Sequence, residues 1–86
     1  MENFSVVANR LSLECLGWAY DGWDYLESGE EPGYDFVRIE GKDGKTTWTP
    51  CDEHGKTFGD CHSTGDDRKT VQDVLELLKN GMAYEL

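Results

Sequence analysis

Two cysteines and two histidines in the second half of the chain have side chains of the types that bind zinc in proteins. Cys51, His54, Cys61 and His62 form the pattern Cys-x2-His-x6-Cys-His. These ligand types suit zinc, and a small domain gains stability from a structural metal. The spacing fits no common zinc pattern, and the adjacent side chains of Cys61 and His62 point opposite ways in an extended chain. A small zinc-stabilised regulatory or adaptor module is therefore the alternative hypothesis, and the main expectation is a protein without a cofactor.

The same region offers a nucleophile and a base, because Cys61 could pair with His54 or His62. Nothing in the sequence supplies a third group to orient the base, or an oxyanion site. Two Gly-Lys-Thr triplets, at residues 44–46 and 55–57, lack the glycine that a phosphate-binding loop places five residues earlier. Neither triplet precedes an expected helix, so their amides do not converge on a phosphate. The sequence therefore predicts a protein that is not an enzyme.

The most informative stretch of the chain has no lysine or arginine between Arg10 and Arg38. We call residues 11–37 the acidic segment, because its seven acids supply −7 of the formal net charge of −10. Four of these acids recur at spacings of three or four, where like charges destabilise a helix. A sequence selected only for folding would intersperse lysines. The acids of the segment are Glu14, Asp21, Asp24, Glu27, Glu30, Glu31 and Asp35.

Aromatic residues are interleaved with these acids, at Trp18, Tyr20, Trp23, Tyr25, Tyr34 and Phe36. A row of carboxylates can occupy a groove of Arg and Lys that is built for a nucleic-acid backbone. Aromatic side chains add rigid contact area and stack on guanidinium groups. The predicted partner-binding residues are Asp21, Asp24, Glu27, Glu30, Glu31 and Asp35, with Trp23 and Tyr25 as apolar anchors. The competing interpretation is that the acids keep the protein soluble and that the tryptophans form the core.

Composition narrows the function classes further. The chain has 86 residues, so we expect a single domain over residues 1–86. A net charge of −10 repels phosphates and argues against direct nucleic-acid binding. No apolar run approaches the ~18 residues of a membrane span. Three cysteines without a recognisable signal peptide indicate free thiols in the reducing cytoplasm.

A small, acidic chain with clustered carboxylates resembles phage-encoded inhibitors of host defence, especially anti-CRISPR proteins. Several such inhibitors mimic nucleic acid to block a nuclease or a surveillance complex. The resemblance rests on size and on the acidic segment, and it assigns no functional residue. It implies a partner that is basic and handles nucleic acid, such as a CRISPR–Cas effector, in the cytoplasm of the host cell.

The expected fold class is α+β, with an N-terminal helix or broken helix, a meander of two or three antiparallel strands, and a C-terminal helix packed on the sheet. The spacing of Phe4, Val7, Leu11, Cys15 and Trp18 predicts helix over residues 4–28, broken near Gly17–Gly22. A strand over residues 11–15 is the alternative. Asp43-Gly44 predicts a two-residue hairpin that aligns Ile39 with Trp48 and Val37 with Pro50.

A short third strand is expected at residues 56–58, followed by a loop over residues 59–69. The last helix is expected to begin with a capping box of Thr70 and Asp73 and to end at Gly81. Its apolar stripe would consist of Val71, Val74, Leu75, Leu78 and Met82.

Overall fold

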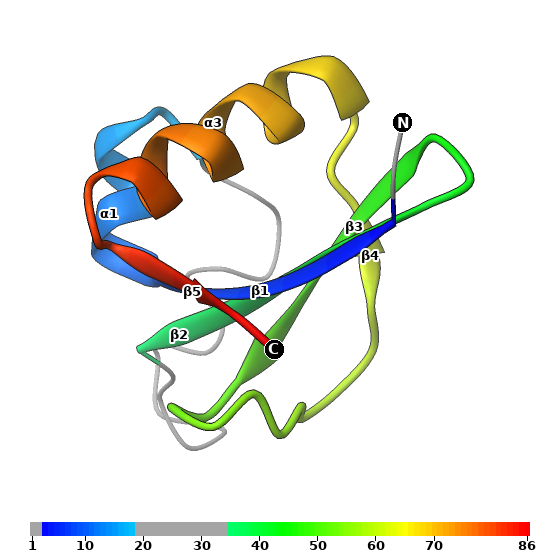
Figure 1. Ribbon diagram of the computed structural model, residues 1–86. Helices are drawn as coiled ribbons and strands as arrows, with labels where there is room; N and C mark the ends of the chain where they lie inside the picture. The colour runs from blue at the N-terminus through cyan, green and yellow to red at the C-terminus, as the bar shows by residue number, and fades with distance from the viewer. Residues whose placement is uncertain (1–2, 19–34) are drawn as a thin grey trace.

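The computed structural model describes residues 3–18 and 35–86, which form an antiparallel sheet covered on one face by two helices (Figure 1). Leu13 of the first helix and Val74 and Leu77 of the last helix join the sheet residues in one core. The α+β class is thereby confirmed, and the sheet has the order β4-β3-β2-β1-β5. The elements are β1 (Phe4–Asn9), α1 (Arg10–Cys15), β2 (Phe36–Lys42), β3 (Lys45–Cys51), β4 (His62–Ser63), α3 (Asp67–Lys79) and β5 (Ala83–Glu85).

The hairpin of β2 and β3 has the predicted turn and register. Asp43 and Gly44 have φ values of 53° and 83°, as a two-residue turn of the primed type requires. Ile39 lies opposite Trp48 and Val37 opposite Pro50. Val37, Ile39 and Trp48 are at most 2% exposed, so the predicted core face is confirmed.

The predicted helix over residues 4–28 is wrong at its start, because residues 4–9 form β1. Val6, Val7 and Ala8 are consecutive and all buried, which means that both faces of this strand are covered. The alternative strand over residues 11–15 is also wrong, since α1 spans this stretch. Asn9 begins α1 by accepting a hydrogen bond from the Leu11 amide at 2.9 Å. The expected second helix, ending near Ser28, lies outside the described residues.

Part of the far face of the sheet, around Val7, is covered by the turn after β3. Gly55 takes a φ of 88°, and a Cβ added there would come within 2.9 Å of Leu86 and 3.3 Å of Val7. Arg38 fixes this turn, because its guanidinium donates to the Gly55 carbonyl at 3.0 Å and to the Ser5 hydroxyl at 3.1 Å. Because Val7 is buried on this face, β1 lacks the alternation of apolar and polar residues that is typical of a strand with one solvent-exposed face.

The strand count of two or three was too low, because the sheet has five strands. The expected strand at residues 56–58 is reduced to one bridge, between Cys51 and Thr57. The chain rejoins β3 only at β4, where His62 lies opposite Trp48. The intervening residues bulge out of the edge, and Gly59 has a φ of 80° there. β1 and β5 complete the sheet, and neither was predicted.

The last helix begins earlier than the capping box indicated. Asp66, not Thr70, is its N-cap, and the Asp66 carboxylate accepts from the Lys69 amide at 3.0 Å. The buried residues of α3 are Thr70, Asp73, Val74 and Leu77. Leu75 and Met82 of the predicted stripe are 62% and 53% exposed, so that stripe was partly wrong. The predicted end is confirmed, since Gly81 follows the helix with a φ of 72°.

Asp67 joins the first turn of α3 to the sheet. Its carboxylate accepts hydrogen bonds from the Thr46 amide and the Thr46 hydroxyl, both at 2.8 Å. The Thr46 hydroxyl also contacts that of Thr64. The backbone N–H of Thr46, and then its hydroxyl, lower the pKa of Asp67 below its usual value. The charged carboxylate is thus the form that stabilises the fold.

We expect the Asp67 contribution to stability to be complete above the ordinary carboxyl pKa and to be lost as the pH falls through the lower pKa of the folded state. Urea unfolding between pH 6 and pH 2 measures this loss. Asp67→Asn should lower stability at pH 6 and reduce the loss of stability at lower pH. Asp60→Asn, at an exposed site, should change stability at pH 6 by less than about 0.5 kcal/mol. Equal pH profiles for wild type and Asp67→Asn would contradict this role.

Candidate binding site

Of the predicted partner-binding residues, Asp35 alone lies in the part of the chain that the structure describes. Asp35 is exposed, directly before β2, and its backbone carbonyl accepts from the Arg10 amide at 2.8 Å. The other predicted residues lie outside the described part of the chain: Asp21, Trp23, Asp24, Tyr25, Glu27, Glu30 and Glu31. Their role therefore stays a prediction from the sequence.

The described residues on either side of positions 19–34 are both attached to α1. Asp35 is held at the first residue of that helix by the Arg10 amide. Trp18 donates its backbone N–H to the Leu13 carbonyl at 3.1 Å. The fold thus fixes the described residues on both sides of positions 19–34 at one short helix, α1.

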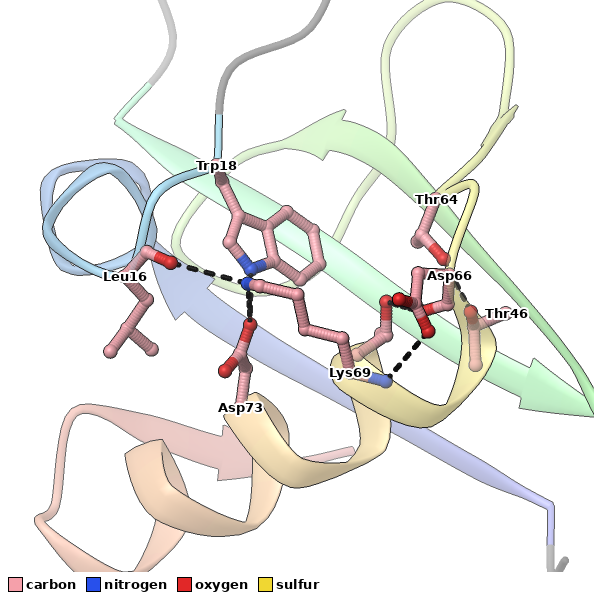
Figure 2. Close-up of polar contacts among 8 residues, drawn as sticks. Leu16, Trp18, Thr46, Thr64, Asp66, Lys69 and Asp73 are labelled. Carbon is pink, nitrogen blue, oxygen red and sulfur yellow. Dashed lines mark hydrogen bonds and ion pairs between the residues drawn. The ribbon is translucent and has the colours of Figure 1, made fainter.

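Trp18 is a core residue, and its indole is held by a buried carboxylate (Figure 2). It is 5% exposed, and its Nε1–H donates to Asp73 Oδ2 at 2.7 Å. Lys69 Nζ donates to the same oxygen at 2.6 Å and to the Leu16 carbonyl at 3.2 Å. The burial of Asp73 is therefore matched by an indole and an ammonium group, as a buried carboxylate requires.

This cluster explains a residue whose role the sequence analysis missed. Asp73 was assigned to a capping box, where it would face the helix N-terminus. Its partner Trp18 is 55 positions away in the sequence, so no local pattern pointed to the contact. The position of Asp73 on the buried face of α3 was the one feature that could have indicated a buried partner for this acid. Trp48, at 2% exposed, is also in the core, so the core interpretation is confirmed for both described tryptophans.

The zinc hypothesis receives no support from the described residues. Among residues 3–18 and 35–86, no three His, Cys, Asp or Glu side chains are arranged to hold a metal ion. Cys51 is buried, whereas His54 and Cys61 are exposed. His62 stacks on the Trp48 ring, with the ring centroids 4.6 Å apart and an interplanar angle of 27°.

Comparison of the chain with protein-family models, curated proteins and solved structures finds no match. Among the described residues, no helix is both long and apolar enough to span a membrane.

Proposed function

We propose that this protein is a non-enzymatic inhibitor that occludes a basic, nucleic-acid-handling partner protein. Its acidic segment takes the place of a nucleic-acid backbone in the cationic groove of that partner. The contacts come from Asp21, Asp24, Glu27, Glu30, Glu31 and Asp35, with Trp23 and Tyr25 as apolar anchors. A CRISPR–Cas effector in the cytoplasm of a host cell is the partner that the resemblance implies.

The observation that carries this proposal is the uneven distribution of charge. All eight Lys and Arg residues lie in the described part of the chain, among 12 acids, which leaves a net charge of −4 there. Residues 19–34 contain five acids and no base, and Glu2 supplies the remaining charge of the total of −10. Half of the net charge is thus concentrated in fewer than a fifth of the residues.

The acids of the described part of the chain support the same proposal, because several have a structural role. Asp66 caps α3, Asp67 holds Thr46, and Asp73 holds Trp18. Asp52 closes the turn after β3 by accepting from the amides of His54 and Lys56, both at 2.9 Å. These four acids thus serve capping, a turn and the core within the described part of the chain.

Occlusion of a cationic groove predicts an interaction with strong salt dependence. Exposed charges attract over about 10 Å at 0.1 M salt, and screening shortens this range. Complementary charge mainly accelerates association and selects the partner, while the aromatic anchors slow dissociation. We therefore expect the affinity for the partner to fall steadily as salt is added.

The test is a double charge reversal, Asp24→Lys with Glu27→Lys, in the full chain. The partner is first isolated from a host lysate and identified by mass, and its affinity is then measured by surface plasmon resonance at several salt concentrations. We expect the double variant to lose at least about tenfold in affinity, because two attractions become repulsions. Its circular dichroism should match that of the wild type.

A matched control changes the net charge equally at exposed sites elsewhere, with Asp60→Lys and Glu76→Lys. This control should bind within about twofold of the wild type, since the charges lie outside the acidic segment. Full affinity of the Asp24→Lys, Glu27→Lys variant, together with no effect of salt, would overturn the proposal.

A further inference from the structure

Two side chains of α3 hold the chain where it leaves α1 (Figure 2). Lys69 Nζ donates at 3.2 Å to the carbonyl of Leu16, the C-cap residue of α1. Asp73 Oδ2 accepts the indole N–H of Trp18 at 2.7 Å, and Lys69 donates to the same oxygen at 2.6 Å. We call these three bonds the α3 network. It fixes the chain immediately before positions 19–34, because Trp18 is the described residue that precedes them.

The backbone between Leu16 and Trp18 is fixed by a local motif as well. Gly17 has a φ of 92°, and its N–H donates to the Glu14 carbonyl at 3.0 Å. The Trp18 N–H donates to the Leu13 carbonyl at 3.1 Å. This is the bonding pattern of a Schellman motif, in which glycine adopts the left-handed conformation just after a helix. The motif thus fixes the backbone of Trp18, and the α3 network fixes its side chain.

A charged pair is not the only choice of side chains that would stabilise this position. The Asp73 carboxylate is buried, and the Lys69 side chain is half exposed. Moving a carboxylate out of water carries a desolvation penalty, and apolar residues of similar volume often replace a buried ion pair without loss of stability. Hydrogen bonds, in contrast, specify direction and distance. The pair therefore adds one defined position for the indole to the packing around it.

We propose that Asp73 and Lys69 are positioning residues for partner binding. They hold Leu16 and Trp18 in the free protein as they are held in the complex, so that the chain at the entry to positions 19–34 needs no further ordering when the partner binds. Ordering of side chains and loops on association weakens affinity, and fixing them beforehand avoids this loss. The inference rests on the proposed function, because it concerns binding through the acidic segment.

The double variant Lys69→Met with Asp73→Leu tests this role. It removes the whole α3 network but keeps similar side-chain volumes and the net charge, since one cation and one anion are lost. Both replacements are good helix formers, and circular dichroism checks the fold. The partner is the protein captured and identified for the charge-reversal test. We expect about three- to tenfold weaker binding by surface plasmon resonance at every salt concentration, with the salt dependence of the wild type.

Hydrogen exchange tests the α3 network in the protein alone. The Trp18 indole N–H is assigned in NMR spectra of the free chain by its absence from Trp18→Phe. It should exchange with deuterium at least about tenfold more slowly in the wild type than in the double variant, because it is buried and bonded to Asp73. Equal exchange in the two chains overturns the inference and does not affect the proposed function.

A core variant serves as the matched control for stability. Ile39→Val lowers stability within the core cluster and leaves the α3 network in place, so it should bind within about twofold of the wild type. Binding as weak as that of the double variant would show that stability alone sets the affinity, and would overturn the inference.

A folded Lys69→Met, Asp73→Leu chain that binds like the wild type also overturns the inference. If that chain does not fold, Lys69→Met with Asp73→Asn takes its place under the same criteria, because asparagine still offers the indole an acceptor. Wild-type affinity of the positioning variant, together with lost affinity of the charge-reversal variant, refutes the positioning role and leaves the proposed function standing. Full affinity of the charge-reversal variant without a salt effect refutes the proposed function, and with it this inference.

Discussion

Trp18→Ala is expected to lower the free energy of unfolding by about 4 kcal/mol, since truncating a buried tryptophan costs 3–5 kcal/mol. Trp18 is 5% exposed and belongs to the main core cluster. The change also removes the indole N–H from Asp73, a buried carboxylate that keeps its contact with Lys69 among the described residues. Urea unfolding followed by circular dichroism measures the effect.

A second variant at Trp18 separates packing from hydrogen bonding in this cluster, and a variant at Leu11 serves as an exposed control. Trp18→Phe keeps an aromatic ring but no donor, and it should cost about 1–2 kcal/mol. Leu11→Ala, in the preceding helix α1 but 64% exposed, should change stability by less than about 0.5 kcal/mol. A Trp18→Ala chain as stable as the Leu11→Ala chain would contradict the core position of this indole.

Cys51 is expected to react with thiol reagents at least about tenfold more slowly than Cys15 or Cys61 at pH 8, because the thiolate is the reactive form. Burial raises the pKa of Cys51 to about 12, the Asp52 carboxylate adds to this shift, and Arg38 opposes it. Cys15 and Cys61 are exposed. Mass spectrometry during labelling with iodoacetamide should show two rapid additions and a third one only after unfolding in urea.

Cys51→Ala should remove the slow addition and leave the two rapid ones unchanged. Labelling of all three thiols at one rate in the folded wild type would show that Cys51 is accessible. The same experiment reports on the fold, because Cys51 lies 1% exposed at the end of β3, next to the turn that Arg38 holds.

The hairpin of β2 and β3 was predictable because its determinants are local. Asp43-Gly44 selects the turn, and a two-residue turn fixes the register of both strands. The alternation of Val37 and Ile39 then identifies the core face. The end of α3 was predictable for the same reason, since glycine in a left-handed conformation at Gly81 needs no information from the rest of the fold.

β1 and β5 depend on contacts that are distant in sequence, and for that reason the sequence analysis missed them. Phe4 and Val7 have helical spacing, but Val7 is buried beneath the turn at Gly55 rather than beside Phe4 on one helix face. β5 has only three residues, and its strand conformation comes from pairing with β1. The spacing of apolar residues along the sequence does not indicate whether both faces of a strand will be covered in the fold.

The candidate site also has one property that the sequence shows directly and another that depends on the fold. Its acidic and aromatic composition is a property of the sequence and was recognisable at once. The attachment of its flanks was not predictable, because Trp18 meets Asp73 of α3 and Asp35 meets Arg10 only in the folded chain. Asp73 in particular resembled a capping residue, and only tertiary packing gives it a different partner.

The position of β1 between β2 and β5 has a consequence for biosynthesis. β1 has one neighbour from residues 36–42 and the other from residues 83–85. This sheet is therefore incomplete until residues 83–85 have been translated, and a nascent chain exposes the unsatisfied side of β1 until then. Such long-range pairing slows folding, so β1 completes its pairing only after the last of these strands has been made.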